Sequence, residues 1–372
     1  MRGRGCGRLS GSGPERVIHH IINQLGVRDG GAEAVVRTLH MGLCARNVPS
    51  TLMAVSEPGV QGSCPYQSLN MSSPYTLKAV PALVRYIRAN CDKQDVIHSH
   101  LFPGNLFVSL AVRLTGWPGA LVTTEHSTSN RRRSKWWGPA VDRLTYARYD
   151  RIFCISDGVR DALDDWMPTL RSKLEVIRNG VALSFSKMPE RKPGAKPVVV
   201  SVGRLSKIKN YDTAIRAVAM LDDLDFEYCI AGGGSENAAL LQLCADLDVS
   251  DKVCFLGYVN DVAALLTRAD VFLIPSRWEG FGLSAVEAMN AGLPVVASNV
   301  PGLSEIVGVD CGPTVDPDSP ASVAEGLRGM LTDPDWRLAC GRNAFTRSQQ
   351  FSADEMVENY LCRYRDLGLA EA

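Results

Sequence analysis

Two cations, Arg204 and Lys209, follow a short apolar run that ends at Gly203. Such a run predicts a buried strand, so both cations belong to the loop after it. An arginine guanidinium pairs with two phosphate oxygens at once, and a lysine acts as a mobile point charge. A diphosphate leaving group needs this kind of clamp, because negative charge builds on it as a sugar–phosphate bond breaks. Spacing alone does not choose between Lys209 and Lys207, and a solvated basic turn is the plain alternative.

Residues 271–292 have the pattern of a strand, a glycine-containing loop and a helix. Gly280 and Gly282 let backbone amides approach a ligand closely, and a helix that starts near Gly282 presents free N–H groups to an anion. Glu279 lies in the loop, and Glu287 lies inside the helix. Two carboxylates in these places suit the recognition of hydroxyls on a sugar ring and on a ribose. Acids that only complement a helix dipole are the alternative, which explains Glu287 poorly.

These side chains must be positioned by regular elements. Short β-branched runs alternate with helical stretches, which predicts parallel sheets with crossover helices. The predicted strands are 17–23, 50–55, 96–100, 120–124, 151–155, 174–177, 198–203, 226–231, 253–256, 271–274 and 294–297. The predicted helices include 32–46, 77–90, 105–114, 138–148 and 157–165, and the last of three closing helical segments is 353–367. Ligands of doubly wound sheets bind outside the carboxyl ends of the strands, so a cleft between two halves is expected.

Composition limits the class of protein. The chain has 372 residues, of which 45% are apolar and 22% charged, as in soluble proteins of two domains. Forty basic and forty acidic side chains balance, which argues against general nucleic-acid binding. Eleven cysteines without a Cys-x-x-Cys pair fit reduced thiols. No apolar run reaches the roughly 18 residues of a membrane span. We therefore predict a cytoplasmic protein, with peripheral attachment to the inner face of the membrane as the alternative.

The segments above resemble the retaining glycosyltransferases of family 4 (glycosyltransferase group 1), which have the GT-B fold. The resemblance rests on EGFGLSAVEAMNAG at 279–292, the clamp at 203–209, GGAE at 30–33 after the first strand and RNGV at 178–181. It covers nearly the whole chain, roughly 17–367, and the glutamate segment is its specific part. It implies an α/β fold of two facing Rossmann-like domains with parallel sheets and crossover helices.

The resemblance, combined with composition, also implies the domain organisation. Residues 1–16 are rich in glycine and arginine and are expected to form a flexible leader. Residues 184–197, with three prolines, are a linker. Residues 17–183 are then the acceptor-side domain, residues 198–350 the nucleotide-sugar domain, and residues 351–372 a C-terminal helix that crosses back to the first domain.

The resemblance implies roles for single residues. Arg204 and Lys209 hold the donor diphosphate, and Lys209, not Lys207, matches the lysine of the family. Glu279 contacts the donor sugar and Glu287 the ribose. The other implied donor contacts are Gly30, Gly31, Phe281, Gly282 and Leu283. The family retains the anomeric configuration and uses no metal or cofactor, and the donor substrate is a nucleotide-diphosphate sugar of the UDP or GDP type.

Histidines are few enough to be weighed singly. His19 and His20 in the first strand and His40 in a helix are predicted to be structural. His100 and His126 each stand at a strand end, where ligands bind. The resemblance places the active-site histidine of the family at His126, where a neutral imidazole can hydrogen-bond a sugar hydroxyl. His100 stays the alternative. Acid-x-acid triplets occur only in helical or turn stretches, so no metal is expected.

The stretch after His126 combines cations with tryptophans, namely Arg131, Arg132, Arg133, Lys135, Trp136 and Trp137. Such a surface suits an anionic membrane face, with the rings at the headgroup level, or a phosphate-linked acceptor. The plain alternative is a solvated basic loop whose tryptophans are partly buried.

These observations predict a retaining, metal-independent glycosyltransferase that moves a hexose-type sugar to a glycan or lipid-linked acceptor, in cell-envelope or surface polysaccharide synthesis. A sugar-nucleotide 2-epimerase on the same fold and a non-catalytic nucleotide-sugar-binding protein are the alternatives. A nicotinamide dehydrogenase is disfavoured, because neither half has G-x-G-x-x-G between a strand and a helix.

Overall fold

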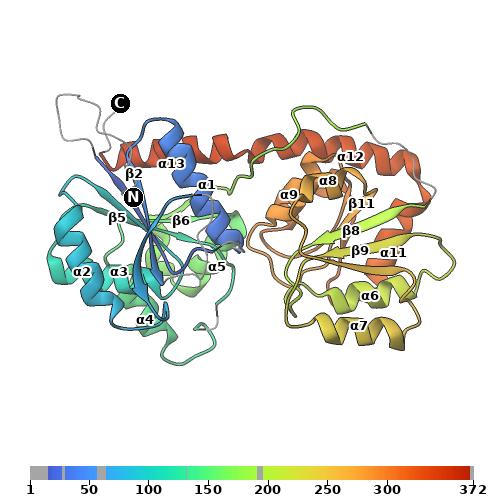
Figure 1. Ribbon diagram of the computed structural model, residues 1–372, viewed down its shortest axis with the longest axis horizontal. Helices are drawn as coiled ribbons and strands as arrows, with labels where there is room; N and C mark the ends of the chain where they lie inside the picture. The colour runs from blue at the N-terminus through green and yellow to red at the C-terminus, as the bar shows by residue number, and fades with distance from the viewer. Residues whose placement is uncertain (1–15, 27–29, 57–63, 131, 191–195, 369–372) are drawn as a thin grey trace, which may run out of the picture. The chain divides into compact units, whose positions relative to one another are not determined.

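The protein is described by a computed structural model at residues 16–26, 30–56, 64–130, 132–190 and 196–368 (Figure 1). The predicted leader, apart from Arg16, and part of the predicted linker lie outside these ranges. The described strands form two sheets, of the orders β3-β2-β1-β4-β5-β6-β7 and β10-β9-β8-β11-β12-β13. Central pairs such as β1–β4 and β8–β11 are parallel. The prediction of two parallel, Rossmann-like sheets is confirmed.

The first sheet consists of β1 (Ile18–Ile22), β2 (Ser50–Ser56), β3 (Gln67–Met71), β4 (Val96–His100), β5 (Ala120–Glu125), β6 (Arg151–Cys154) and β7 (Leu174–Val176). The second consists of β8 (Val198–Val202), β9 (Glu227–Ala231), β10 (Val253–Gly257), β11 (Val271–Ile274), β12 (Val295–Ser298) and β13 (Thr314–Val315). Two edge strands, β3 and β13, were not predicted. The first is polar and largely exposed, and the second has only two residues, so neither shows a buried apolar run.

The helices up to β8 are α1 (Gly31–Ala45), α2 (Ala79–Asn90), α3 (Gly104–Thr115), α4 (Gly138–Tyr146) and α5 (Asp157–Trp166). Those after β8 are α6 (Tyr211–Ala219), α7 (Asn237–Asp246), α8 (Val262–Thr267), α9 (Leu283–Asn290), α10 (Ser304–Val307), α11 (Pro320–Thr332), α12 (Pro334–Ser348) and α13 (Ala353–Asp366). Short 3-10 turns lie at Pro168–Lys173, Val309–Cys311 and Gln349–Phe351. Helices α2 and α3 lie side by side, as do α6 and α7 (Figure 1).

Both faces of the second sheet are buried. Val199 and Leu273 pack into the apolar cluster that holds residues of α6 and α11, while Val200 and Phe272 pack into the one that holds residues of α9. Successive side chains of a strand point to opposite faces, so a strand covered on both faces is apolar at nearly every position, with Ser201 of β8 as a buried exception. The short apolar runs of the sequence therefore predict these strands within one or two residues.

The first sheet has a polar interior where the C-terminal helix contacts it. The ring of His98 on β4 is fully buried, with its Nδ1 2.6 Å from the hydroxyl of Tyr364 and its Nε2 2.8 Å from the hydroxyl of Thr124. The hydroxyl of Tyr360 lies 3.0 Å from that of Thr124. Both tyrosines belong to α13, so the predicted return of the last helix to the first sheet is confirmed.

The chain divides into two compact units. One comprises Met1–Thr124, Asp142–Ile152 and Asn359–Ala372, and the other Glu125–Val141 and Phe153–Glu358. The two sheets separate between Val176 and Val198, which brackets the predicted linker. The compact units divide the chain elsewhere, so the proposed domain bounds stay predictions.

The buried contact between His98 and Tyr364 gives a test of the fold. We expect Tyr364→Phe to lower the free energy of unfolding by about 1–3 kcal/mol, because it removes a hydrogen-bond partner from a buried polar atom. Urea unfolding followed by circular dichroism measures the change. Tyr75→Phe is the matched control, since Tyr75 is 70% exposed. Equal stability of the two variants would contradict a stabilising role of the buried hydroxyl.

Candidate functional site

The loop after β8 and the loop after β11 leave neighbouring strands at the same edge of the second sheet. We name residues 203–210 the lysine loop and residues 275–282 the glutamate loop. Lys209 and Glu279 come together across them, with Nζ 2.6 Å from Oε2, and both side chains are partly buried. Ser276 lies 3.4 Å from the same carboxylate oxygen. Two residues that are far apart in the chain therefore form one charged site.

The structure distinguishes the two lysines that spacing left open. Lys207 is exposed, whereas Lys209 pairs with the glutamate loop. Arg204 lies in the same loop and is exposed, so its guanidinium is accessible to a ligand. The geometry thus agrees with the assignment of Lys209 that the resemblance implies. The role of both cations in holding a diphosphate stays a prediction.

Asn210 closes the lysine loop. It adopts a left-handed backbone conformation with φ of 61°, which asparagine tolerates better than most residues. Its side-chain amide donates to the carbonyl oxygens of Pro275 at 2.8 Å and Pro317 at 2.6 Å, and its Oδ1 accepts from the hydroxyl of Thr213. One of these bonds reaches the start of the glutamate loop, so the two loops are tied together through the backbone.

Gly282 ends the glutamate loop in a conformation that requires glycine. Its φ is 88°, and a Cβ atom there would lie 2.8 Å from Leu303 Cδ1. Helix α9 begins at the next residue, Leu283, as predicted. Phe281 is buried, with its ring edge-on to Phe351 at 5.6 Å between centroids, so its side chain fills the core. The Phe281 side chain is therefore closed to a ligand, and the donor contacts of Phe281, Gly282 and Leu283 stay predictions.

Glu287 lies inside α9. Burial raises the pKa of its carboxyl group to about 7, because a desolvated carboxylate is disfavoured. The side chain therefore changes charge near neutral pH, unlike an exposed glutamate. An acid that only complements the helix dipole would be exposed and would keep an ordinary pKa, so that alternative does not explain the burial or the raised pKa of Glu287. Its contact with a ribose stays a prediction.

His126 directly follows β5. Its Nδ1 is closed to solvent, and burial lowers its pKa to about 4, so the imidazole is neutral at pH 7. Gly280 belongs to the same compact unit, and a Cβ atom there would lie 2.5 Å from the carbonyl oxygen of His126. The glutamate loop thus passes close to the backbone of this histidine. The neutral ring fits the predicted hydrogen bond to a sugar, which stays a prediction.

The alternative histidine, His100, lies in the core. It is 1% exposed, its ring centroid lies 4.0 Å from that of His98, and its Nε2 lies 3.2 Å from Nδ1 of His20. These contacts favour a structural role and leave His126 as the better candidate. His19 and His40 are buried and hydrogen-bonded too, which confirms their structural assignment.

Sequence reasoning missed one grouping. His20, His98 and His100 each offer a nitrogen within 4.8 Å of the others. Adjacent strands β1 and β4 bring them together, with His20 paired to His98 in register. Distance alone would allow one metal ion, but both nitrogens of His98 lie within hydrogen-bond distance of hydroxyls. We interpret the group as part of the polar core, and the absence of a metal from the reaction stays a prediction.

The stretch of cations and tryptophans is only partly a surface. Burial disfavours a surface contact for Arg132, whereas Arg133 is only partly buried and its predicted contact stays a prediction. Arg132 is 7% exposed, and the guanidinium of Arg133 donates to the carbonyl oxygens of Thr128 at 2.8 Å and Ala162 at 3.0 Å. A tight turn directs these arginines inward, with Asn130 Oδ1 accepting from both of their backbone N–H groups.

Part of that stretch does face solvent. Trp136 is 92% exposed, Trp137 is 39% exposed and Lys135 is exposed. Arg131 lies outside the described residues.

Gly30 and Gly31 form the N-terminus of α1, with Gly30 as its N-cap residue. Their contribution to the donor site stays a prediction.

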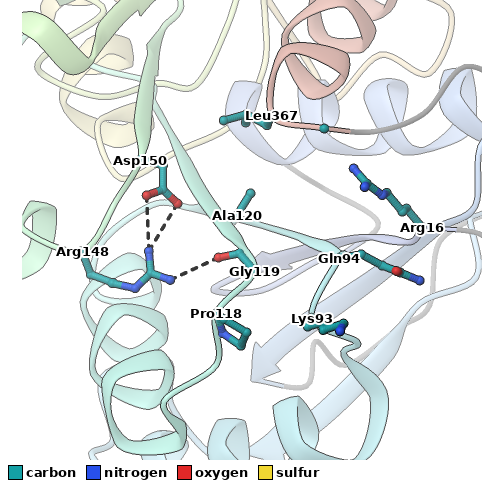
Figure 2. Close-up of a pocket in the computed structure, with 10 residues that line it drawn as sticks. Arg16, Lys93, Gln94, Pro118, Gly119, Ala120, Arg148, Asp150 and Leu367 are labelled. Carbon is teal, nitrogen blue, oxygen red and sulfur yellow. Dashed lines mark hydrogen bonds and ion pairs between the residues drawn. The ribbon is translucent and has the colours of Figure 1, made fainter.

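A cavity of about 500 Å³ in the first compact unit is a different feature (Figure 2). Several of its lining residues closely precede strands of the first sheet, including Gln94 before β4 and Asp150 before β6, and others follow α13. Arg148 is held there by Asp150 and by the carbonyl oxygen of Gly119 (Figure 2). The cavity therefore lies at the amino ends of the strands, and none of the candidate site residues lines it.

Comparisons with known proteins agree with this arrangement. The profile of a family described as glycosyltransferase family 4 matches residues 29–185, and that of glycosyl transferases group 1 matches residues 185–347. Glycogen synthase of Mycobacterium tuberculosis is 30% identical over 280 residues, which cover 70% of this chain and 65% of that protein. The chain thus spans less than two thirds of the length of that relative. An uncharacterized glycosyltransferase of Methanocaldococcus jannaschii is 31% identical, over 68% of this chain and 70% of its own length.

Solved structures show the same fold at lower identity. HepE of Anabaena in complex with UDP and glucose superposes with a TM-score of 0.80 at 18% identity, covering 94% of this chain and 99% of that one. Sucrose-phosphate synthase from Thermosynechococcus elongatus superposes with a TM-score of 0.76 at 21% identity, covering 96% of this chain and 100% of that one. Among the described residues, no helix combines the length and apolar character of a membrane span. From the two adjoining profiles and the archaeal relative, we conclude that this chain belongs to the group 1, family 4 glycosyltransferases and has their GT-B fold.

Proposed function

We propose that this chain is a retaining, metal-independent glycosyltransferase. It moves a hexose-type sugar from a UDP- or GDP-type donor to a glycan or lipid-linked acceptor, in the synthesis of cell-envelope or surface polysaccharide. The observation that carries the proposal is the pairing of Lys209 with Glu279 at 2.6 Å, beside the exposed Arg204. A cation for the diphosphate and a carboxylate for the sugar hydroxyls then stand next to each other, as transfer of a sugar from a diphosphate requires.

The proposed reaction breaks the bond between the anomeric carbon and the diphosphate oxygen. The acceptor hydroxyl attacks the same face of the sugar, and its proton passes to the departing phosphate oxygen. Arg204 and Lys209 stabilise the negative charge on that oxygen, which grows as the bond breaks. Glu279 accepts hydrogen bonds from the sugar, and the neutral imidazole of His126 holds another hydroxyl. Two positive side chains supply the charge that a metal ion supplies in other transferases.

Several relatives support parts of the proposal. Crystal structures of Anabaena HepE contain UDP or UDP-glucose, which favours a UDP-type donor here. A D-inositol 3-phosphate glycosyltransferase of Salinispora tropica is 30% identical over 309 residues, which favours transfer to a hydroxyl acceptor. The lipopolysaccharide outer core galactosyltransferase WaaB shares the fold at a TM-score of 0.74.

The surface of Lys135 and Trp136 supports a place for the reaction. A cation beside a tryptophan that is 92% exposed suits the headgroup region of an anionic membrane. We propose that the enzyme is cytoplasmic and binds the inner face of the membrane peripherally through these residues.

Donor turnover tests the proposed function. A panel of nucleotide sugars is first screened by thermal shift, and release of the nucleoside diphosphate is then measured with and without an acceptor extract. We expect release that depends on the acceptor, and a loss on the order of 10²–10³ in kcat for Glu279→Gln, since a hydrogen bond to the transition state is weakened. Glu325→Gln, at an exposed site on α11, is the matched control.

The same assay separates the alternatives. A changed sugar that is released without an acceptor would indicate an epimerase. Nucleotide binding without turnover in any combination, or turnover that persists unchanged in Glu279→Gln, would contradict the proposed reaction.

The raised pKa of Glu287 predicts a pH-dependent stability. The folded protein holds this proton more tightly than the unfolded chain does, so the free energy of unfolding should fall as the pH rises from about 4.5 through about 7. The contribution amounts to at most roughly 3 kcal/mol. Glu287→Gln should remove it, which urea unfolding of both proteins at pH 5 to 8 measures. A difference between them that does not vary with pH would show that this carboxyl titrates normally.

Vesicle sedimentation tests the membrane surface. With phosphatidylglycerol-containing vesicles we expect binding that weakens at high salt, and a loss of about fivefold for Lys135→Ala from one surface charge. Trp136→Ala should weaken binding further. Trp336→Ala is the control, because Trp336 is 41% exposed on α12. Equal binding of the Trp136 and Trp336 variants would contradict the proposed surface.

A further inference from the structure

Arg277 lies in the glutamate loop, two residues before Glu279, and no role has been assigned to it so far. Its backbone N–H donates to the carbonyl oxygen of Ile208 at 2.8 Å. Its Nη1 donates to the carbonyl oxygen of Lys207 at 3.0 Å. Both acceptors belong to the lysine loop and directly precede Lys209. One residue therefore holds the backbone of the opposite loop at two successive positions.

The remaining donors of the same guanidinium reach three other side chains. The distances are 3.4 Å to each carboxylate oxygen of Asp212, 3.5 Å to the hydroxyl of Thr213 and 3.4 Å, from Nε, to Asp318. Asp212 and Thr213 begin α6, and Asp318 precedes α11. Arginine suits this place because its planar group offers five donors in a fixed geometry, whereas lysine offers one compact ammonium.

Asn210 makes the complementary contact. It reaches from the lysine loop to the carbonyl oxygen of Pro275, two residues before Arg277. Each loop thus sends one side chain to the backbone of the other. Lys209 lies between the two contact points of its loop, and Glu279 follows Arg277 by two residues. The loops are held together by backbone bonds that do not depend on the ion pair itself.

We infer that Arg277 is a positioning residue that sets the distance and register between Lys209 and Glu279. The inference rests on the proposed function for its effect on catalysis, but the coupling of the two loops does not depend on it. Arg277 acts through the loops and needs no contact with the substrate. A displacement of about 1 Å between catalytic groups can lower a rate by about 10²-fold. Loss of the contacts that fix the two loops should therefore lower the activity.

A matched substitution separates positioning from simple stability. Arg328 also forms a two-pronged ion pair, with Asp223 at 2.6 and 2.8 Å, on the surface of the same compact unit. Exposed ion pairs contribute little to stability. The carboxylates that pair with Arg277, Asp212 and Asp318, are exposed as well, so we expect Arg277→Ala to shift the melting temperature only somewhat more than Arg328→Ala, by the loss of its bond to the carbonyl oxygen of Lys207.

Hydrogen–deuterium exchange is the decisive measurement. Peptides that cover residues 203–210 and 275–282 should exchange faster in Arg277→Ala than in the wild type, and should be unchanged in Arg328→Ala. Arg277→Lys should give an intermediate rate, since one ammonium replaces part of the contacts. Unchanged exchange of both loops in Arg277→Ala would overturn the inference, whether or not the protein is active.

Kinetics then connect the coupling to the reaction. We expect Arg277→Ala to lower kcat/KM by on the order of 10²-fold, and to add little to the loss already caused by Lys209→Ala. Full additivity of the two losses would mean that Arg277 does not act through Lys209, and would overturn the inference. A wild type that turns over no nucleotide sugar would contradict the proposed function, while the exchange measurement would still decide the role of Arg277.

Discussion

Strands β8 and β11 are neighbours in a parallel sheet, and the loops after them therefore leave the sheet at one edge. This adjacency brings Lys209 within 2.6 Å of Glu279, although the two residues are 70 positions apart in the chain. Strands β8 and β11 are almost wholly apolar because both faces of their sheet are covered, so the charged residues of this part lie in the loops. The candidate donor site follows from that confinement.

Burial also shifts the pKa values of two other candidate residues, Glu287 and His126. It raises the pKa of the Glu287 carboxyl and lowers the pKa of the His126 imidazole, because a desolvated group avoids its charged form. The charged pair of Lys209 and Glu279 is thus accompanied by a neutral ring and by a carboxyl that titrates near neutral pH.

Polar groups elsewhere serve the fold. His98, Thr124, Tyr360 and Tyr364 connect the first sheet to α13 by hydrogen bonds in the core. Arg133 resembles a surface cation in the sequence, but it donates to the carbonyl oxygen of Ala162, a residue well beyond its own turn. Composition and spacing record that a polar residue is present and do not show whether its partner is solvent, protein or ligand.

The sequence by itself determined most of the strands, the family and the two loops that carry the charged residues. Apolar runs and glycine turns act over a few residues, so their meaning is local. The polar edge strand β3 escaped prediction because it has no buried face to mark it. Tertiary structure paired Lys209, and not Lys207, with Glu279, placed His100 in the core and buried Arg132. Lys209 and His100 each have a partner from a distant segment, which strand adjacency selects and no local pattern encodes, whereas Arg132 is buried beside a local turn at Asn130.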